Sequence, residues 1–355
     1  MNIHKTEMPP AFFALLSAIL FGASTPASKI LLGAVGPQLL AGLLYLGSGI
    51  GLAVFLVSTN RLDPAKSTQT FRRSDGLWLA GAVVFGGIIA PLILMIGLKS
   101  TMASAASLLL NLEGVFTASI AWIAFKEHTD RRIVLGMIAI VLGGVILSWV
   151  PGHALVFPVG SLAIVGACLC WALDNNLTRN VSDLDPSLVA CIKGLVAGSV
   201  NCIIALCTGS TMPALLLVAS AAVTGFVSYG ISLVLFIKSL RSLGTARTGA
   251  YFSTAPFAGA LLSVLMLREH VSPNLLVAGA LMTVGVILHL TEKHVHEHVH
   301  AAVEHGHRHT HDEHHNHEHT GDETRGEPHS HPHSHDELRH SHRHYPDAEH
   351  RHDHD

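Results

Sequence analysis

The chain has 355 residues, of which 49% are hydrophobic and only 13% are Asp, Glu, Lys or Arg. Its net charge of −3 averages two unlike parts: residues 1–291 hold 16 Lys and Arg against 10 Asp and Glu (+6), whereas residues 292–355 hold 6 against 15 (−9). The acidic polar segment argues against nucleic-acid binding. The lack of a Gly-rich phosphate loop, a nucleophile motif and a polar catalytic domain argues against an enzyme.

Ten apolar stretches of about 18 to 25 residues follow one another, each long enough to cross a ~30 Å hydrocarbon core as a helix. The predicted helices span residues 11–32, 37–57, 76–98, 101–125, 132–149, 158–178, 187–207, 215–238, 244–267 and 274–291. We expect no cleavable signal peptide, because the first stretch is needed to complete a repeat. These lengths predict an all-α integral membrane protein in contact with the lipid bilayer.

The stretches form two copies of a five-helix pattern. Residues 98–128 (LKSTMASAASLLLNLEGVFTASIAWIAFKEH) align without a gap with residues 240–270 (LRSLGTARTGAYFSTAPFAGALLSVLMLREH). An odd number of spans per copy inserts the second copy upside down, an arrangement typical of secondary transporters. We therefore predict two inverted five-helix repeats, at 11–149 and 158–291.

The positions of Lys and Arg predict the orientation of these spans. With both termini in the cytoplasm, the cytoplasmic loops hold most of these residues, and the outer loops hold little beyond Lys99 and Arg268. The cytoplasmic set is Arg61, Lys66, Arg72, Arg73, Lys126, Arg131, Arg132, Arg179, Lys238 and Arg241. The expected location is the cytoplasmic (inner) membrane, with the polar C-terminal segment inside the cell.

Three prolines interrupt predicted spans: Pro26, Pro91 and Pro256. A proline inside a helix frees a backbone carbonyl, which in lipid is tolerated where protein or a wet cavity takes it up. These three positions therefore point to the transport pathway, with Pro26 and Pro256 as the candidate pathway residues, and simple helix kinks are the alternative.

Ionisable side chains within spans are candidates for function, because they are costly in lipid. Glu113 lies near the midpoint of the fourth span, close to Asn111 and with no Lys or Arg within a turn. Such a carboxyl group suits a proton-coupled or cation-binding role. The alternative is a structural carboxyl group that is hydrogen-bonded to a neighbouring helix.

The sixth span contains Trp171-Ala-Leu-Asp174-Asn175-Asn176, and three consecutive polar side chains are hard to place against lipid. Trp171, Asp174 and Asn175 are predicted to line a substrate pathway, although Asp174 alternatively pairs with an arginine. Tyr251 in the ninth span either offers a hydrogen bond to substrate or bonds to its neighbours.

Other charged residues lie nearer the span ends. We interpret Lys29 and Lys193 as snorkelling to the membrane interface. Glu127 and Glu269 close the fourth and ninth spans in the sequences KEH and REH, which predicts a structural ion pair or helix-end contact.

The two halves, the FKE and LRE endings, the proline in APFAGALLSVLMLRE and the Trp before DNNLTR together resemble the EamA-type drug/metabolite transporter superfamily. The resemblance covers about residues 11–290 and excludes the C-terminal segment. It implies a ten-helix inner-membrane carrier with a cavity between the halves. Members move amino acids, nucleotide sugars, drugs and other metabolites. Glu113-Gly114 departs from many relatives, which have an uncharged stretch with a proline there.

The C-terminal segment, residues 292–355, contains 22 of the 27 histidines and lacks the apolar residues needed for a core, so we predict that it is disordered alone. Histidine interleaved with carboxylates favours Zn²⁺, Ni²⁺ or Co²⁺. No cofactor is required. The candidate ligands are His294, His296, His298, His300, His305, His307, His309, His311, His314, His315, His317, His319, His329, His331, His333 and His335.

The leading hypothesis is a secondary transporter that moves a small organic metabolite or drug by alternating access, in the direction of efflux, with a cytoplasmic metal-binding tail. One alternative is an exporter of Ni, Co or Zn, although no histidine lies at the centre of a span. Another is a membrane metal buffer or sensor without transport. These patterns leave the substrate, coupling ion and oligomeric state open.

Overall fold

The computed structural model describes residues 9–59, 73–125, 130–149, 157–181 and 184–291 of the membrane body, and residues 295–300, 303–309, 329–335 and 338–343 of the C-terminal segment. The two parts are separate compact units, Met1–Glu292 and Lys293–Asp355. Glu127 and the candidate ligands His294, His311, His314, His315, His317 and His319 lie outside the described residues.

The described part of the body contains ten helical spans that are long and apolar enough to cross a membrane. They are Pro10–Leu31, Pro37–Ser58, Asp75–Ser100, Ala103–Phe125, Arg131–Ser148, Val159–Val181, Pro186–Cys207, Leu215–Leu243, Arg247–Leu267 and Pro273–Leu290. Each coincides with one predicted stretch, and the ends differ by a few residues. The protein is therefore an all-α membrane protein, as the sequence predicts.

Several spans are divided into shorter helical elements. The first repeat comprises α1 (Pro10–Gly22), α2 (Ser24–Leu31), α3 (Pro37–Ser58), α4 (Arg73–Ala82), η1 (Val83–Ile89), α5 (Ala90–Ser100), α6 (Ala103–Leu109), α7 (Leu112–Phe125) and α8 (Arg131–Ser148). The second comprises α9 (Val159–Thr178), η2 (Arg179–Val181), α10 (Pro186–Cys207), α11 (Leu215–Gly225), η3 (Phe226–Ile231), α12 (Ser232–Leu243), α13 (Thr245–Phe252), α14 (Ala255–Leu267) and α15 (Pro273–Leu290).

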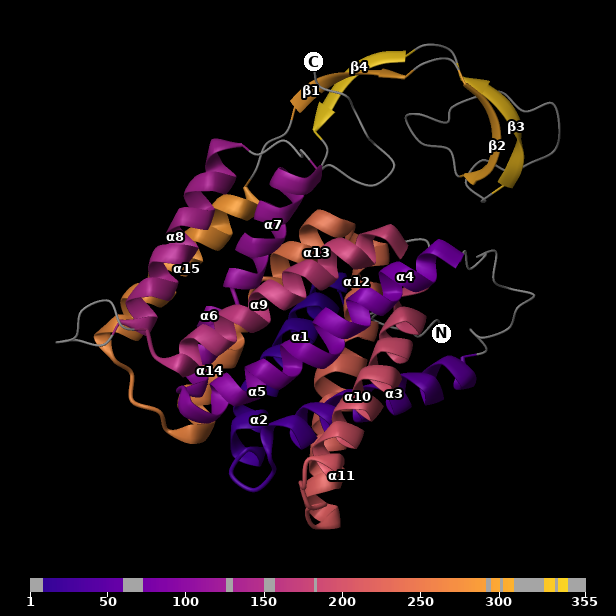
Figure 1. Cartoon of the computed structure of the whole chain (residues 1–355). Helices are drawn as coiled ribbons and strands as arrows, with labels where there is room; N and C mark the ends of the chain where they lie inside the picture. The colour runs from indigo at the N-terminus through magenta and orange to yellow at the C-terminus, as the bar shows by residue number, and fades with distance from the viewer. Residues whose placement is uncertain are drawn as a thin grey trace, which may run out of the picture. The chain divides into compact units, whose positions relative to one another are not determined.

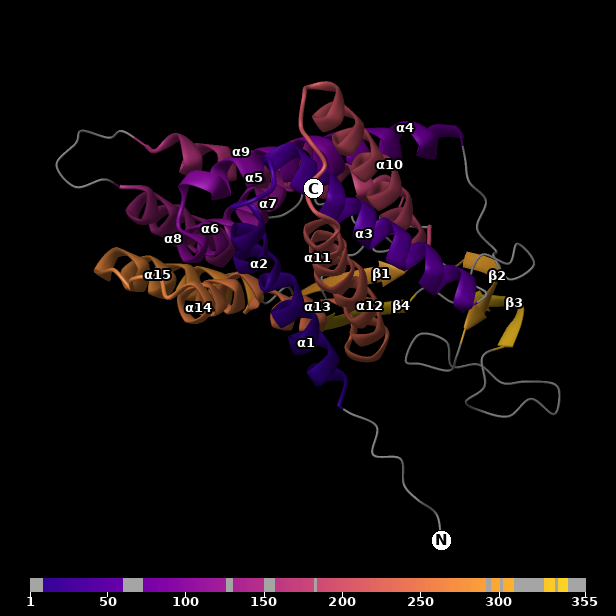
Figure 2. The same cartoon turned by 90° about the horizontal axis from the view of Figure 1, so that it is seen from below.

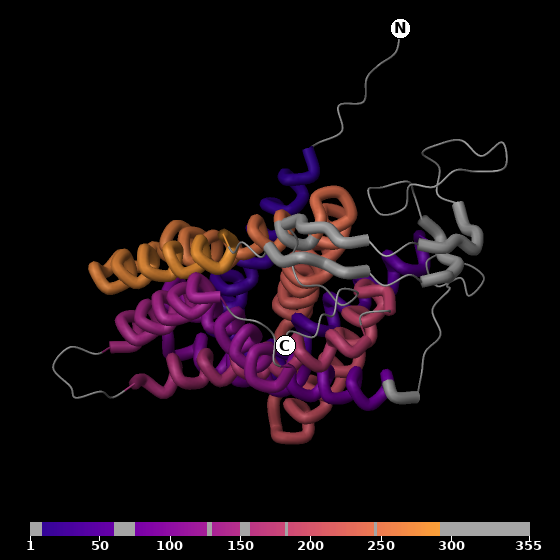
Figure 3. Tube along the Cα trace, turned by 90° about the horizontal axis from the view of Figure 1, so that it is seen from above, coloured from indigo at the N-terminus to yellow at the C-terminus, as the bar shows by residue number. Residues whose placement is uncertain are grey.

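The helix contacts follow the symmetry of two inverted repeats. Corresponding spans pack together as α3 with α10, α6 with α14, and α8 with α15. Two further contacts are related by the same symmetry. The third span packs on the sixth (α5 with α9), and their counterparts, the eighth and the first, also pack together (α12 with α1). Figures 1, 2 and 3 show α8 and α15 side by side, magenta beside orange. Both repeats therefore contribute to the centre of the body.

The third and eighth spans each contain a π-helical segment that the sequence did not predict. The segments η1 and η3 fall at corresponding positions of the repeats, because the register that aligns residue 98 with residue 240 also aligns Gly86 with Ser228. A π turn frees carbonyl groups from the regular i→i+4 ladder and is frequent at functional sites. The two repeats thus share this local departure from α-helical backbone as well as their order of spans.

Pro26 and Pro256 follow turns between helical segments, whereas Pro91 directly follows the π-helical segment η1 within a continuous span. Pro91 and Pro256 lie in the first turns of α5 and α14, and Pro26 is the third residue of α2. A proline fits the first turn because the N–H that it lacks would have no partner there. Turns at residue 23 and residues 253–254 divide the first and ninth spans, whereas η1 changes the helix type within the third span.

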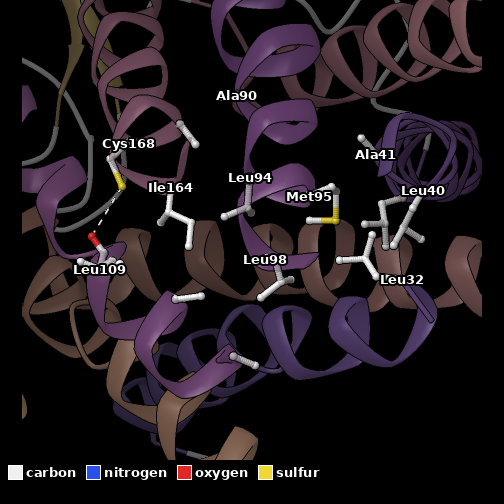
Figure 4. Packing of buried hydrophobic residues seen from close by; sticks show 14 of the residues in the cluster. Leu32, Leu40, Ala41, Ala90, Leu94, Met95, Leu98, Leu109, Ile164 and Cys168 are labelled. Carbon is white, nitrogen blue, oxygen red and sulfur yellow. Dashed lines mark hydrogen bonds between the residues drawn. The ribbon is translucent and has the colours of Figure 1, made fainter. Parts of the chain in front are cut away.

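A large apolar cluster joins α3, α5 and α9 (Figure 4). Leu40, Leu94, Leu98 and Ile164 are almost completely buried within it. Small residues allow the closest crossings: a Cβ on Gly49 would lie 2.5 Å from the backbone nitrogen of Leu195, so α3 and α10 require glycine there.

The described residues of the C-terminal segment form four short strands. They are β1 (Val295–His300), β2 (Val303–His309), β3 (His329–His335) and β4 (Leu338–Arg343). The strands pair antiparallel as β1 with β4 and β2 with β3, with Val295 opposite Arg343 and Val303 opposite His335. An isolated two-stranded ladder is marginal in water, so disorder of the segment on its own stays a prediction.

A candidate substrate cavity between the repeats

A cavity of about 780 Å³ lies between the two repeats. Its lining comes from α1, α2, α3, α5, α7 and α8 of the first repeat and from α9, η2, α10, η3, α12, α13, α14 and α15 of the second. The volume is within the range of about 300–1,000 Å³ that is typical of small-molecule sites. The cavity is therefore large enough for an organic solute.

One side of the cavity is a continuous aromatic wall, formed by Tyr45, Tyr229, Phe21, Phe252 and Phe236. Successive ring centroids in that order lie 5.8, 5.9, 5.4 and 5.0 Å apart, in tilted or edge-to-face arrangements. These distances are typical of interacting aromatic pairs. The wall gives the cavity a large apolar surface to which both repeats contribute.

The polar lining is centred on Glu113 of α7. Asn175 of α9 donates a hydrogen bond to Glu113 Oε1 at 2.9 Å and another to Thr117 Oγ1 at 3.3 Å. Asn111 also lines the cavity and donates to the carbonyl of Leu108 at 2.9 Å. Within the described residues, no Lys, Arg or His nitrogen lies within ion-pair distance of Glu113.

A buried ion pair lies beside this region. Lys193 Nζ of α10 is 2.6 Å from Asp174 Oδ1 and 2.5 Å from Oδ2, and Thr178 donates to Oδ1 at 2.9 Å. The side chain of Lys193 lines the cavity, whereas Asp174 is buried and is not part of the described lining. The interpretation of Lys193 as a snorkelling residue is wrong, because the nearby carboxylate attracts it more strongly than the interface does. The partner of Asp174 is a lysine, not an arginine.

The π-helical segment η1 supports this arrangement through the carbonyl of Gly86. Tyr45 Oη donates to that oxygen at 2.9 Å, and Trp171 Nε1 donates at 3.0 Å. A Cβ at position 86 would overlap the Asp174 carboxyl group. Glycine thus allows α9 to approach η1, and the freed carbonyl orients two residues of the cavity wall.

The structure brings together most of the residues that the sequence singled out. Trp171 and Pro256 line the cavity with the polar residues already described. Pro26 is buried in α2, and neither it nor Tyr251 is among the described lining residues. The carbonyl of Tyr251 instead accepts a hydrogen bond from Thr254 at 2.6 Å.

The cavity reaches one end of the body. Its lining includes Arg179, Val181, Leu184 and Pro186, at the connection between the sixth and seventh spans. The described lining contains no residue of the α5–α6 connection, which lies at the opposite ends of the spans. The conformation is therefore that of a carrier with its cavity directed toward one side.

Two charged residues fix the opposite end. Lys29 Nζ donates to the carbonyls of Leu98, Lys99 and Thr101, at 2.6, 3.2 and 2.7 Å. Lys29 thus reaches the ends of the third and fourth spans and caps the C-terminus of α5, where a cation complements the helix dipole.

Glu269 caps the next helix, as the sequence predicts for a helix-end contact. Its two carboxylate oxygens accept from the backbone N–H groups of Ala103 and Ser104, at 2.7 and 2.8 Å. These groups at the N-terminus of α6 have no partner within the helix. Lys29 and Glu269 together hold the α5–α6 connection, and we call this contact the end clamp.

Sequence reasoning missed the aromatic wall and the pairing of Lys193. The five aromatic residues come from four different spans, so no local sequence pattern marks them as one cavity wall. Lys193 carried a usable signal: it is a base in the seventh span, and an acid, Asp174, lies in the sixth. Two opposite charges in lipid are expected to pair.

The described residues contain no group of three or more His, Cys, Asp or Glu arranged to hold a metal ion. For the candidate ligands within β1, β2 and β3, namely His296, His298, His300, His305, His307, His309, His329, His331, His333 and His335, the structure gives the backbone register alone. Metal binding by the tail stays a prediction.

Ten membrane-spanning helices in two inverted repeats, with a cavity between the repeats that is directed to one side, define a carrier-type membrane transporter. The model of the EamA-like transporter family matches residues 8–149 and 158–291, which is more than half of the chain. The chain therefore belongs to this family and is a transporter of the drug/metabolite superfamily.

Relatives agree with this assignment. An uncharacterized transporter of Methanothermobacter thermautotrophicus is 29% identical over 77% of this chain and 84% of its own length. The uncharacterized transporter YyaM of Bacillus subtilis is 23% identical over 76% and 92%. A probable 4-amino-4-deoxy-L-arabinose-phosphoundecaprenol flippase subunit ArnE of Pseudomonas fluorescens is 37% identical over 26% of this chain and 77% of its own. One crystal structure superimposes with a TM-score of 0.58 at 19% identity over 79% and 95% of the two chains.

Proposed function

We propose that this transporter moves a small organic metabolite or drug through the cavity between its repeats by alternating access. The observation that supports the proposal is an aromatic, partly polar cavity of about 780 Å³ that reaches one end of the body while the end clamp holds the other. A solute in this cavity would contact both repeats. A rocking motion of one repeat against the other would then transfer its exposure between the two sides of the membrane.

The direction of transport follows from a further proposal about orientation. The distribution of Lys and Arg favours a protein in the cytoplasmic membrane with both termini in the cytoplasm. The cavity mouth, at the connection between the sixth and seventh spans, would then face the cytoplasm. This conformation is suited to loading a solute from inside the cell, which supports efflux.

Gly114 offers a direct test, because it lines the cavity and a Cβ there would meet no atom within 4 Å. Gly114→Trp should fill the cavity without a backbone clash. Gly36→Trp is the matched control, since Gly36 also has open space but lies in the α2–α3 connection. Untargeted mass spectrometry of cells and medium would compare cells that express each protein.

We expect the native chain and Gly36→Trp to lower the cellular amounts, and raise the amounts in the medium, of the same organic solutes. Gly114→Trp should change the amounts of none of them. Equal solute profiles for the native chain and Gly114→Trp, with equal amounts of protein in the membrane, would refute transport through this cavity. Solutes that accumulate in the cells rather than in the medium would refute efflux and keep the cavity as the pathway.

Metal binding by the tail is a separate proposal, supported by its 22 histidines and 15 acidic residues. Export of Ni, Co or Zn through the body has weaker support, since the described cavity lining offers one carboxylate, amide groups and the single imidazole of His289 rather than a set of imidazole or thiolate ligands. To separate metal binding by the tail from metal export through the body, the Ni, Co and Zn contents of cells would be measured. The cells would express the full chain, a chain ending at Leu290, or Glu113→Gln. Metal export requires that Glu113→Gln raise the metal content while the tail is intact.

A further inference from the structure

We propose that the solute carried in the cavity is an amphipathic organic cation with one positive charge, and that Glu113 binds this charge. The inference rests on the proposed function, because it assigns a substrate class to the same cavity. Three observations support it: the balance of charges around the cavity, the arrangement of the aromatic wall, and the volume.

One carboxylate of the described inner lining, that of Glu113, has no direct ion-pair partner. Lys193 is matched by Asp174, with both carboxylate oxygens in contact with its ammonium group. Glu113 receives one hydrogen bond from the neutral amide of Asn175 and has no ion-pair partner in the described residues. A carboxyl group in low-dielectric surroundings is neutralised by a proton or by a cation. A cationic ligand supplies the missing charge.

The same balance disfavours an anionic ligand. Lys193 is engaged by Asp174. Arg179 lies at the mouth, with its guanidinium carbon 5.1 Å from the centroid of the Phe125 ring. An anion deep in the cavity would therefore have to displace Asp174 from Lys193 and would remain close to Glu113. A monovalent cation requires neither change.

The aromatic wall specifies the rest of the ligand. Five rings from α1, α3, η3, α12 and α13 present apolar faces and edges to the cavity. Aromatic faces attract organic cations, by about 0.5–2 kcal/mol for each contact, and bury the apolar body of the same molecule. A hydrated inorganic ion would leave this surface unused. The volume of about 780 Å³ admits a molecule with several rings.

Tetraphenylphosphonium and tetraphenylborate provide a matched pair of probes, because they have nearly the same shape and opposite charges. Binding would be measured by equilibrium dialysis with the full chain in lipid nanodiscs, and empty nanodiscs would correct for partition into lipid. Glu113→Gln keeps an acceptor for Asn175 and removes the charge. Asp130→Asn removes a charge outside the cavity, at the N-cap of α8, and is the matched control.

We expect saturable binding of the phosphonium to the native chain and to Asp130→Asn, and at least tenfold weaker binding to Glu113→Gln. Tetraphenylborate should not bind saturably. Unchanged affinity in Glu113→Gln, or equal binding of both probes, would overturn the proposal. Retained thermal stability of Glu113→Gln would show that a loss of binding is not a loss of fold.

The two proposals fail in different ways. If Gly114→Trp abolishes solute movement but the native chain does not bind the phosphonium, the cavity is the pathway and the substrate class is wrong. If the phosphonium binds through Glu113 while Gly114→Trp leaves solute movement intact, the cation site stands and the proposed transport pathway falls.

Discussion

The two repeats have the same helical framework but differ in the positions that carry charged residues. Spans two and seven, α3 and α10, both begin with proline and have 22 residues, which places Lys193 opposite Leu44 in the repeat register. Under the register of spans four and nine, Glu113 corresponds to Ala255. Spans one and six start after Pro9 and Pro158, and Asp174 then corresponds to Thr25.

The charged members of all three pairs have uncharged counterparts. The aromatic wall draws on both repeats, since Phe21 and Tyr45 meet residues of the second repeat. The comparison teaches that both repeats supply residues that shape the cavity, whereas each charged group occurs at only one of two corresponding positions. Exchanging residues between corresponding positions can therefore test the role of each charge.

The largest effect is expected when one member of the buried ion pair is replaced by its counterpart. Asp174→Thr or Lys193→Leu alone leaves an unpaired charge in the membrane interior, which should cost about 3–5 kcal/mol of stability. The double variant removes both charges and should be much closer to the native chain than the sum of the single effects predicts. Thermal unfolding of four purified full-length proteins, the native chain, the two single variants and the double variant, would complete a double-mutant cycle.

Lys238→Leu is the matched control for this cycle, because Lys238 is exposed and lies 3.9 Å from the centroid of the Phe13 ring. It should lose less than about 1 kcal/mol. Additive effects of Asp174→Thr and Lys193→Leu would contradict a coupled pair.

A smaller effect is expected at the π-helical segment of the third span. Gly86→Ala places a methyl group against the Asp174 carboxyl group, which should force α9 and η1 apart and cost about 1–3 kcal/mol. At Gly114, where a Cβ meets no atom within 4 Å, the same substitution should leave stability unchanged or raise it by up to about 1 kcal/mol. Equal unfolding temperatures for the two alanine variants would show that the close approach at Gly86 does not matter.

The end clamp should contribute less, because it lies at helix ends. Lys29→Met removes three hydrogen bonds to carbonyl groups at the end of α5, and a helix-end cation is worth about 0.3–2 kcal/mol. Lys29→Arg keeps the charge and several donors and should retain most of the stability. Thermal unfolding of both variants checks this. If Arg is as destabilising as Met, the fit of the ammonium group matters rather than its charge.

The fold was predictable because membrane spans are defined by length and apolarity, and the repeat was visible in residues 98–128 and 240–270. Glu113, Asn175 and Trp171 were also identifiable, because polar groups in lipid are costly. The π segments were not predicted, since glycine and β-branched residues in η1 and η3 are compatible with an ordinary membrane helix. The aromatic wall needed tertiary information, because Phe21, Tyr45 and Tyr229 lie in three separate spans.

The smallest effect on the body is expected from deleting the C-terminal segment, which lies outside both repeats and forms a separate unit. A chain ending at Leu290 should unfold at the same temperature as the full chain in metal-free buffer, and it should lose nearly all binding of Zn²⁺, Ni²⁺ and Co²⁺ in equilibrium dialysis. Because metals bind neutral imidazole, and the reference pKa of histidine is about 6.5, binding to the full chain should weaken as the pH falls below about 6. Acidification would also change the charge of the segment from about −9 toward about +13 as its histidines take up protons. A truncated chain that keeps most of its metal binding would place the ligands in the body instead. The charged residues that distinguish corresponding positions of the two repeats would then be the first candidate ligands.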